Sequence, residues 1–406
     1  MSKYQNRELR SIAHFNPPEK IKDGQIAKKI PMAQIRAYQR KIDGFEIAEY
    51  KSGPKFRNGD VLVAKITPCL ENGKTAFVDI LGEDELAFGS SEFIVLRAKN
   101  NTDNIFLYYL ARSPAFRKKA IGCMEGTSGR KRVNEGVLKL YELPIPEKLT
   151  QTKIANVLSA LDAKIELNNR INTELAAMAK IIYDYWFVQF DFPDANGKPY
   201  KTSGGKMTYN STLKYEIPVD WVCETLLNIA TFTNGLACQK FRPKNEQYYK
   251  VIKIREMGEG FTENSELVTV NIPEKVIVNN GDILFSWSAT LDIKIWTGGK
   301  GALNQHIFKI TSKKYPKSFY YFQLLNYLQH FKMIAELRKT TMGHITQEHL
   351  QQSRIVIPPV NLIAQLDEVI KPILDEKVKL EEESQQLSQL RDWLLPMLMN
   401  GQVKVQ

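Results

Sequence analysis

Apolar side chains recur along residues 151–187 at alternating steps of four and three. The seam consists of Ile154, Leu158, Leu161, Ile165, Leu175, Ala179, Ile182 and Trp186. This spacing predicts a long α-helix that packs along one face against another helix. Asn168 and Asn172 fall on the same seam, where buried amides weaken packing but fix the register of a helix pair. At about 1.5 Å per residue, the helix is expected to be about 50 Å long.

A second seam lies near the C-terminus, where leucine or isoleucine recurs every seven residues. It comprises Leu366, Ile373, Leu380, Leu387 and Leu394, with polar Lys377 and Ser384 at companion positions. The string at 161–165, LDAKI, is matched by LDEKV at 374–378. Pro372 is expected to kink this helix or delay its start, because proline lacks the N–H that an interior turn needs. The matching strings favour two related helices that pair, and two unrelated amphipathic helices are the alternative.

The first half of the chain is repeated in the second half. Six landmarks recur in the same order: 9–15 with 226–232, 58–64 with 280–286, 90–96 with 304–310, the aromatic segments 106–110 and 319–323, the glycine-containing loops 126–129 and 341–343, and the proline-containing segments 144–146 and 358–359. Short β-branched runs after turn signals predict strands. The pattern predicts two copies of a globular α/β unit, each followed by a long helix.

The order of these parts predicts the architecture. We expect a first globular unit over 1–148, a long helix over 149–190, a linker rich in Gly, Pro and Lys over 191–220, a second globular unit over 221–358 and a second long helix over 359–406. The second helix can pair with the first only by running back along it. The predicted fold class is therefore α/β, with two repeated globular units separated by an antiparallel pair of long coiled-coil helices.

The charge of the chain is unevenly distributed. The net charge is +11, with 26 Lys and Arg against 18 Asp and Glu in residues 1–148, 17 against 13 in 216–358, and 5 against 8 in 359–406. Basic globular parts favour a polyanion such as DNA as ligand, and a basic protein without a nucleic-acid role is the alternative. No apolar run of about 18 residues and no secretory signal is found, so we expect a cytoplasmic protein.

Basic and amide side chains in predicted loops are the candidates for DNA contact. In the first unit they are Lys65, Lys74, Arg130, Lys131 and Arg132. In the second they are Lys240, Arg242 and Lys244 in one loop, Lys253 and Arg255 on a predicted strand, Lys300, and the polar or aromatic residues Ser286, Trp287, Ser288, Asn304, Gln305, His306 and His344. Lys and Arg suit phosphates, whereas Arg, Asn and Gln suit base edges. The alternative for each is a solvated surface position, and for Trp287 and His306 a packing role.

Signatures of catalysis and of metal binding are mostly missing from the sequence. Asn16-Pro17-Pro18-Glu19 partly matches the Asn-Pro-Pro-aromatic motif of adenine methyltransferases, but Glu19 cannot stack on a base. No phosphate-binding loop or His-Glu-x-x-His motif occurs, and the four cysteines lack zinc-site spacing. The sequence therefore predicts a chain that is not an enzyme and holds no metal. A stand-alone DNA methyltransferase, or a coiled-coil scaffold without DNA contact, remains as an alternative.

Several longer strings resemble one known family. They are NGLA at 234–237, QKFRP at 239–243, VIKIR at 251–255, ALNQHIF at 302–308, QTKIA at 151–155 and YWFVQFDF at 185–192. Together with the repeat they resemble the DNA specificity subunit of type I restriction-modification systems. The resemblance covers essentially the whole chain and is weakest in the first globular unit.

The resemblance implies properties that the residues alone do not show. Such subunits are not enzymes, and their two globular parts are target-recognition domains that each read one part of a gapped DNA site. They hold two methyltransferase subunits that use S-adenosylmethionine, and the larger assembly adds ATP- and magnesium-dependent translocase-nuclease subunits. The cluster of Tyr183, Tyr185, Trp186 and Phe187 would then be a partner-binding surface, with packing inside the protein as the alternative.

Overall fold

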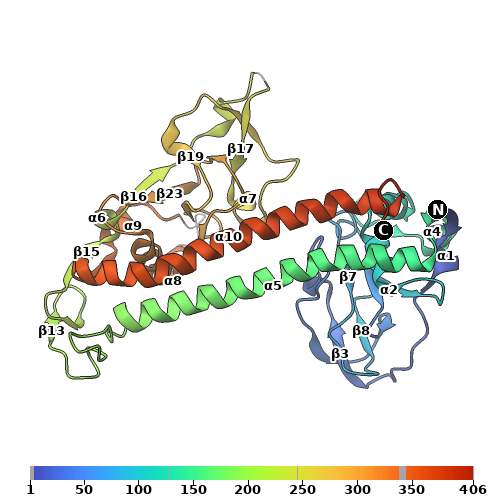
Figure 1. The fold of residues 1–406 in the computed structure, drawn as a ribbon, viewed down its shortest axis with the longest axis horizontal. Helices are drawn as coiled ribbons and strands as arrows, with labels where there is room; N and C mark the ends of the chain where they lie inside the picture. The colour runs from blue at the N-terminus through green and yellow to red at the C-terminus, as the bar shows by residue number, and fades with distance from the viewer. Residues whose placement is uncertain (1–3, 128, 245, 338–343, 406) are drawn as a thin grey trace. The chain divides into compact units, whose positions relative to one another are not determined.

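The chain forms two compact units, each of which contains segments of both long helices. The computed structural model describes residues 4–127, 129–244, 246–337 and 344–405. Unit 1 comprises Met1–Glu166 and Gln386–Gln406, and unit 2 comprises Leu167–Gln385 (Figure 1). Among the described residues, no helix combines the length and the apolar character that crossing a membrane requires.

Unit 1 is built on two four-stranded sheets. The first is antiparallel in the order β2 (Ala13–Phe15), β9 (Phe93–Ala98), β6 (Val61–Ala64) and β7 (Thr75–Phe77). The second is mixed, in the order β4 (Glu46–Glu49), β3 (Ile26–Ile30), β8 (Ala87–Gly89) and β5 (Lys55–Phe56). The remaining elements are β1 (Gln5–Glu8) paired with β12 (Glu142–Ile145), β10 (Met124–Glu125) paired with β11 (Arg132–Val133), α1 (Leu9–Ile12), η1 (Met32–Gln34), α2 (Asn104–Arg112), α3 (Pro114–Gly122) and α4 (Glu135–Leu140).

Unit 2 repeats the plan of both four-stranded sheets. Its antiparallel sheet has the order β16 (Thr231–Asn234), β23 (Ile307–Thr311), β20 (Ile283–Ser286) and β21 (Asp292–Ile295). Its mixed sheet has the order β18 (Leu267–Thr269), β17 (Tyr248–Ile252), β22 (Gly301–Leu303) and β19 (Ile277–Val278). The other elements are β13 (Met207–Asn210) with β14 (Tyr215–Pro218), β15 (Val222–Thr225) with β24 (Arg354–Ile357), α6 (Leu226–Ile229), η2 (Cys238–Lys240), α7 (Ile254–Glu259), η3 (Glu274–Val276), α8 (Lys317–Leu337) and α9 (Gln347–Gln352).

The predicted internal repeat is therefore confirmed by the topology of the two units. In both, the only parallel pairing of the mixed sheet joins its two central strands, β3 with β8 and β17 with β22, among the described residues. The loop landmark at 341–343 lies outside the described residues.

The Asn-Gly-Asp turn before β6 and β20 shows why the repeat is visible in the sequence. Gly59 and Gly281 adopt φ of 88° and 84°, a left-handed conformation that glycine accepts without a Cβ clash. The aspartate that follows each glycine binds a cation on the neighbouring strand, Asp60 with Arg97 at 2.7 Å and Asp282 with Lys309 at 2.8 Å. The turn therefore ties two strands of the central sheet together in both units.

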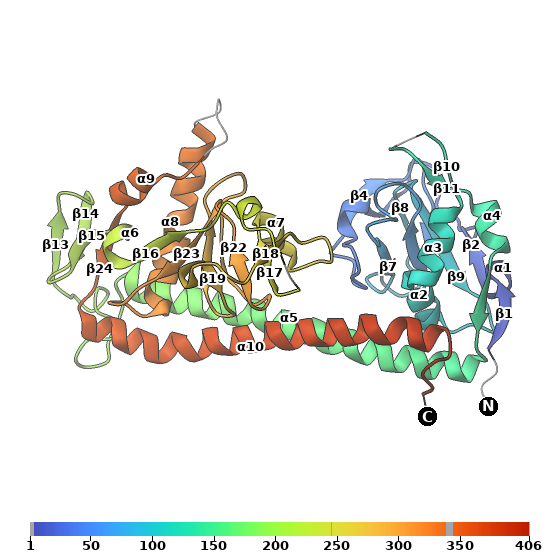
Figure 2. The same cartoon turned by 90° about the horizontal axis from the view of Figure 1, so that it is seen from above.

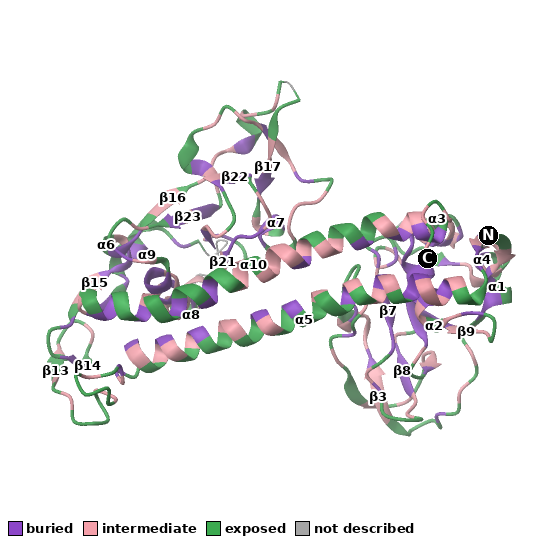
Figure 3. Ribbon diagram, in the orientation of Figure 1, coloured by how far each residue is buried: buried purple, intermediate pink, exposed green. Residues whose placement is uncertain are grey.

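The central strands β6 and β20 each contribute side chains to two different cores, because side chains alternate across a strand. In unit 1, Val61 and Val63 of β6 pack in the cluster that includes α2, whereas Leu62 faces the second sheet. In unit 2, Ile283 and Phe285 of β20 lie in the cluster with α8, and Leu284 lies in the other. Every residue of β6 and β20 is buried, and Figure 3 shows where buried residues gather in each unit. Each unit is therefore a helix layer and two sheets, as an α/β fold requires.

Both long helices predicted from the heptad seams are present. They are α5 (Lys148–Phe187) and α10 (Val360–Met399), each of 40 residues. In each unit a segment of α5 lies antiparallel to a segment of α10 (Figures 1 and 2). Asp162 contacts Arg391 in unit 1 at 2.5 Å, and Asn168 contacts Glu383 in unit 2 at 2.7 Å. The antiparallel pairing predicted from the order of the parts is therefore confirmed within each unit.

Pro372 does not delay the start of α10, so that part of the sequence prediction is wrong, and the predicted kink stays a prediction. The helix begins at Val360, and both Pro372 and Glu368 are exposed. A proline removes the hydrogen bond to the carbonyl four residues earlier. Because the carbonyl of Glu368 lies on the exposed face, water can take the place of the missing donor.

The segment 191–220, predicted as a linker, carries structure of its own. It contains the hairpin β13–β14, and Phe192 stacks on Tyr200 with ring centroids 4.6 Å apart and on Trp221 at 5.3 Å. Aromatic side chains bury a large apolar area, which offsets the polar composition on which the linker interpretation was based.

The seam amides Asn168 and Asn172 are buried, as the sequence predicted, and Ser384 of α10 is buried with them. The side-chain amide of Asn168 donates to Glu383. Both polar atoms of Asn172 and the hydroxyl of Ser384 have no hydrogen-bond partner among the described residues. A buried polar group without a partner costs stability, so this polar layer favours one register at the expense of packing.

We expect Asn172→Leu to raise the free energy of unfolding by about 1–2 kcal/mol, because leucine removes two unpaired buried groups. Urea unfolding of the purified chain measures the change. Asn169→Leu on the exposed face of the same turn is the matched control, and its effect should stay within about 0.5 kcal/mol. A loss of stability in Asn172→Leu would instead mean that ordered water satisfies the amide.

Candidate nucleic-acid interface

Two of the basic residues predicted in unit 1 meet acidic side chains at the end of the central strand. Lys65 follows β6 directly and its Nζ lies 3.8 Å from Oε1 of Glu135. The Arg132 guanidinium donates to both oxygens of Glu92 at 2.7–3.0 Å. These hydrogen bonds hold the pKa of Glu92 below its ordinary value. The Arg132 side chain is half exposed, so water screens the pair and it can exchange for a ligand at small cost.

The other predicted residues of unit 1 differ in their availability. Arg130 and Lys131 are exposed and form no ion pair with any described residue. Lys74 instead donates to the carbonyl of Met32 at 3.0 Å and is partly buried. The loop 129–132 therefore offers two cations to a polyanion, whereas Lys74 holds two backbone segments together.

Three predicted residues of unit 2 come together around one indole ring. Trp287 follows β20, and its ring centroid lies 5.6 Å from that of His306 and 5.5 Å from that of His344. Its Nε1–H donates to Oδ1 of Asn234 at 3.4 Å. Gln305 contacts His306 through Nε2 at 3.3 Å. Trp287 is partly buried and both imidazoles are exposed, so the cluster presents nitrogen atoms and ring edges to solvent.

Three further candidates in unit 2 are buried and are withdrawn from the candidate interface. Ser286, Ser288 and Asn304 lie inside the unit. Ser286 donates through Oγ to the carbonyl of Thr290 at 2.5 Å and accepts from the backbone N–H of Asp292. Polar residue type and loop position suggested these residues, but all three are buried, and the side chains of Ser286 and Asn304 form hydrogen bonds within the unit.

Gly235 fixes the basic loop of unit 2 beside the Trp287 cluster. A Cβ added to Gly235 would lie 2.2 Å from the carbonyl oxygen of Asn304, so no other residue allows this approach. The neighbouring Leu236 donates to Leu303 at 2.8 Å and accepts from Gln305 at 2.9 Å. The three exposed cations that follow in this loop are Lys240, Arg242 and Lys244.

Lys253 and Arg255 do not alternate on a strand, so that interpretation is wrong. The strand β17 ends at Ile252, and Arg255 lies in helix α7. The buried carboxylate of Glu256 accepts from the backbone N–H of Lys253 and from the Arg255 guanidinium, which starts the helix. Lys253 pairs with Glu266 at 2.7 Å. Lys300 is exposed, with Nζ 5.2 Å from the centre of the Tyr249 ring.

The aromatic cluster predicted as a partner-binding surface is mostly interior. Tyr183 stacks on Phe322 at 5.0 Å, and Phe187 packs against Phe319 and Trp221. Both are buried, and burial raises the pKa of Tyr183 well above its ordinary value. The packing interpretation therefore holds for these two residues. Tyr185 is exposed and Trp186 is partly buried.

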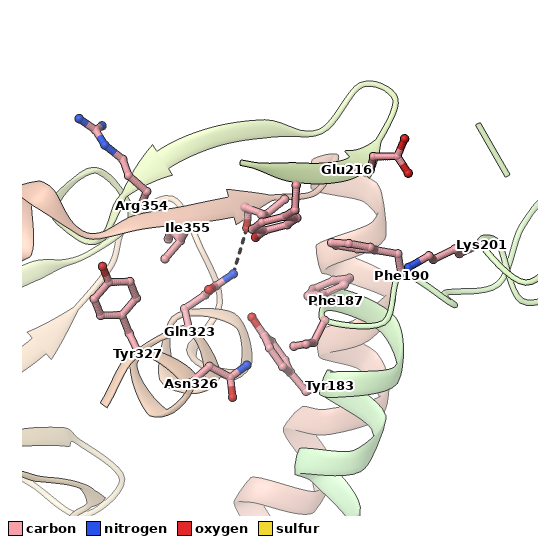
Figure 4. A pocket seen from close by; sticks show the side chains of 13 residues that line it. Tyr183, Phe187, Phe190, Lys201, Glu216, Gln323, Asn326, Tyr327, Arg354 and Ile355 are labelled. Atoms are coloured by element: carbon pink, nitrogen blue, oxygen red, sulfur yellow. Dashed lines mark hydrogen bonds between the residues drawn. The ribbon is translucent and has the colours of Figure 1, made fainter. Parts of the chain in front are cut away.

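Tyr183 and Phe187 also line a pocket of about 520 Å³ in unit 2. Figure 4 shows the Tyr183 hydroxyl directed into the space between Asn326 and Gln323, whose amide is bonded to Val356. Within the described residues this hydroxyl has no hydrogen-bond partner. The exposed Val188 contributes to the same lining.

An exposed apolar stripe on α5 was not found from the sequence. It runs along unit 2 through Leu167, Met178, Ile181 and Tyr185, and the exposed Val188 follows directly after the helix ends. Ile181 is 67% exposed. The steps from 178 to 185 are three and four residues, which places these side chains on one helix face. The spacing of these apolar residues could have predicted the stripe as a second heptad seam on this helix. The longer seam from Ile154 to Trp186 explained the helix by itself, so the stripe was not predicted.

The two clusters would hold no metal on the residues present. In the part of the chain that is described, no group of three or more His, Cys, Asp and Glu side chains converges in a way that suits an ion. The clusters offer hydrogen-bond donors, acceptors and ring surfaces, which are the groups that contact nucleic-acid bases and phosphates.

The α/β unit is repeated, with a different polar cluster at the end of each central strand, and the two long helices pair. These features define a class of protein built from two related modules. The family model for the type I restriction modification DNA specificity domain matches residues 1–177 and 218–390. The chain belongs to this family.

Relatives span most of the chain. The type I restriction enzyme MjaIX specificity subunit of Methanocaldococcus jannaschii is 23% identical over 321 residues, covering 76% of this chain and 71% of that protein. The type I restriction enzyme HindI specificity subunit of Haemophilus influenzae is 23% identical over 408 residues, covering 86% of this chain and 87% of that protein. The crystal structure of the S subunit from M. genitalium has the same fold, with a TM-score of 0.58 at 15% identity over 98% of this chain and 96% of that one.

Proposed function

We propose that this chain is the DNA sequence-recognition subunit of a type I restriction-modification complex and reads a gapped site with two different target-recognition domains. One observation carries the proposal. The same fold is present twice, and at the same place in each copy the side chains differ: charged around Lys65 and Arg132 in unit 1, aromatic and imidazole around Trp287 in unit 2. Different side chains read different bases, so the two half-sites should be unlike.

We infer that the chain is not itself an enzyme. Among the described residues, its clusters contain no nucleophile held by a base, and its sequence lacks the cofactor loop of a methyltransferase. Methyl transfer from S-adenosylmethionine would then belong to two methyltransferase subunits. ATP and Mg²⁺ would belong to translocase-nuclease subunits, and the complex would act on chromosomal DNA in the cytoplasm.

The experiment that tests this function combines the chain with its methyltransferase subunits. Duplexes with randomised sequence are incubated with the complex and S-adenosylmethionine, and the methylated adenines are mapped. The expected result is one bipartite motif with a constant gap, and methylation that requires this chain. Methyl transfer by the isolated chain, or methylation by the complex without a sequence motif, would contradict the proposal.

We further propose that the exposed stripe of unit 2 receives a helix of a partner subunit. Heptad-spaced apolar residues that are open to solvent suit an amphipathic helix. Met178 and Ile181 have no role in the core of the unit, so burial against a partner explains their apolar character. Tyr185, one of the residues predicted to bind a partner, lies in the same stripe.

Ile181→Glu should weaken the binding of the methyltransferase subunit about 10- to 100-fold, because it places a charge in the centre of an apolar contact. The fold should persist, since Ile181 is 67% exposed. Titration of the partner with the labelled chain measures the affinity. Thr173→Glu, exposed on another face of α5, is the control. Equal affinities for both variants would remove the stripe from the interface.

A further inference from the structure

The two polar clusters are held by the same backbone hydrogen bonds. In unit 1 the N–H of Lys65 donates to the carbonyl of Glu92 at 2.9 Å, and in unit 2 the N–H of Trp287 donates to that of His306 at 3.3 Å. The carbonyl of Lys65 accepts from Val133 at 2.8 Å, and that of Trp287 accepts from Ile345 at 3.0 Å. The structure therefore aligns three positions of unit 1 with three of unit 2, far apart in the sequence.

We call these the reading positions. Lys65 of unit 1 is equivalent to Trp287 of unit 2, Glu92 to His306, and Arg132 to His344. Arg132 directly precedes Val133, and His344 directly precedes Ile345. Because the bonds that join the three segments are made by the backbone, they do not depend on the side chains. The central strands β6 and β20 that lead into the first position are fully buried, so the platform is rigid.

The side chains at the reading positions differ between the two units, whereas the Asn-Gly-Asp turn before β6 and β20 is the same in both. Asp60 and Asp282 both keep a cation partner in the neighbouring strand. The first reading position directly follows the strand that this turn begins, and the other two lie on neighbouring segments. At these three positions the charged set of unit 1 is replaced by an aromatic and imidazole set in unit 2. A recognition site that reads different sequences needs a constant backbone arrangement that carries different side chains.

We propose that the reading positions determine which bases each unit accepts, a proposal that rests on the function proposed above. In unit 1 the Arg132 donors suit O6 and N7 of guanine, and the Glu92 carboxylate suits the amino group of cytosine. Their mutual ion pair opens to take the two bases of one G·C pair. In unit 2, Gln305 beside the reading positions suits adenine, and the indole of Trp287 suits the thymine methyl group.

Selection from randomised duplexes by the complex of the full chain with its methyltransferase subunits tests the proposal. The unit 1 variant is E92Q/R132Q, and its matched control is R36Q/D43N, another exposed ion pair of the same unit, 2.5 Å long. E92Q/R132Q should lose roughly 10- to 100-fold of the discrimination for one G·C pair in one half-site. The other half-site and the gap should not change.

The reciprocal variant is H306A in unit 2. Its control is H330A, an exposed histidine on α8 that also contacts an aromatic ring. H306A should change the preference only in the half-site that E92Q/R132Q leaves intact. The retained half-site shows that each variant is folded and bound.

The outcomes separate this inference from the proposed function. If the unaltered complex selects no bipartite motif, the proposed function fails and the inference fails with it. If the motif appears but both variants keep every base preference, or lose affinity equally for all sequences, the function stands. The reading positions are then phosphate contacts or structural residues, and the inference is overturned.

Discussion

Asp162→Ala is expected to lower the free energy of unfolding by about 3–5 kcal/mol, because it removes the buried counter-charge of the Arg391 guanidinium and leaves it with only the half-exposed Asp392 as a partner. Asp162 is 9% exposed and accepts from the Tyr109 hydroxyl at 2.5 Å and from Arg391 Nη1 at 2.5 Å. Burial raises the pKa of Tyr109, which keeps its phenol protonated and able to donate. The carboxylate thus joins α2, α5 and α10 within unit 1.

The repeat supplies a matched control for this prediction. Asp375 is the residue of α10 aligned with Asp162, but its side chain is 54% exposed and pairs with Lys371, another exposed residue. Asp375→Ala should leave the unfolding midpoint nearly unchanged, since water already solvates both charges. Urea unfolding followed by hydrogen exchange of residues 104–112 reports on unit 1 specifically.

A double variant separates loss of charge from loss of packing. D162L/R391M removes both buried charges and replaces them with apolar side chains, and it should recover most of the stability that Asp162→Ala loses. If D162L/R391M is as unstable as Asp162→Ala, the ion pair itself is not the source of the effect. If Asp162→Ala and Asp375→Ala behave alike, the buried network contributes nothing measurable.

Replacing Lys240, Arg242 and Lys244 together with alanine is expected to lower the affinity of the reconstituted complex for duplex DNA about 10- to 100-fold near physiological salt. All three are exposed and belong to the loop that Gly235 anchors beside the reading positions of unit 2. For each side chain that binds a phosphate, its removal should also reduce the slope of log affinity against log salt by about 0.9. Binding isotherms at several salt concentrations measure both quantities.

The control for this variant removes the same charge elsewhere in unit 2. Lys198, Lys206 and Lys214 lie within the segment 191–220, so K198A/K206A/K214A changes the net charge equally. Its salt slope should stay unchanged. A slope that falls equally in both variants would assign the effect to net charge and not to direct binding of phosphates.

The equivalent unit 1 variant, R130A/K131A/R132A, should also weaken binding and flatten the slope. We expect most of the change in slope to come from Arg130 and Lys131, because Arg132 is already paired with Glu92. An unaltered slope in this variant would remove the loop at 129–132 from the DNA footprint.

The sequence was most informative where a local rule repeats. The Asn-Gly-Asp turn was predictable because only glycine tolerates φ near 85° there, and the buried amides Asn168 and Asn172 were predictable from the heptad spacing. Arg255 was misplaced because apolar alternation suggested a strand. The buried Glu256 carboxylate, a tertiary feature, starts a helix at that point instead.

Taken alone, the sequence determined the repeat, the two long helices and the basic character of the globular parts, since each follows from spacing or composition that is legible along the chain. Only the tertiary structure decided which candidates share a surface. Lys65, Glu92 and Arg132 are brought together by backbone hydrogen bonds between segments far apart in the chain, whereas Ser286 and Tyr183 are removed from the surface by packing. The physical reason is that burial and proximity depend on how elements stack, and no local pattern encodes the neighbour that a side chain will meet.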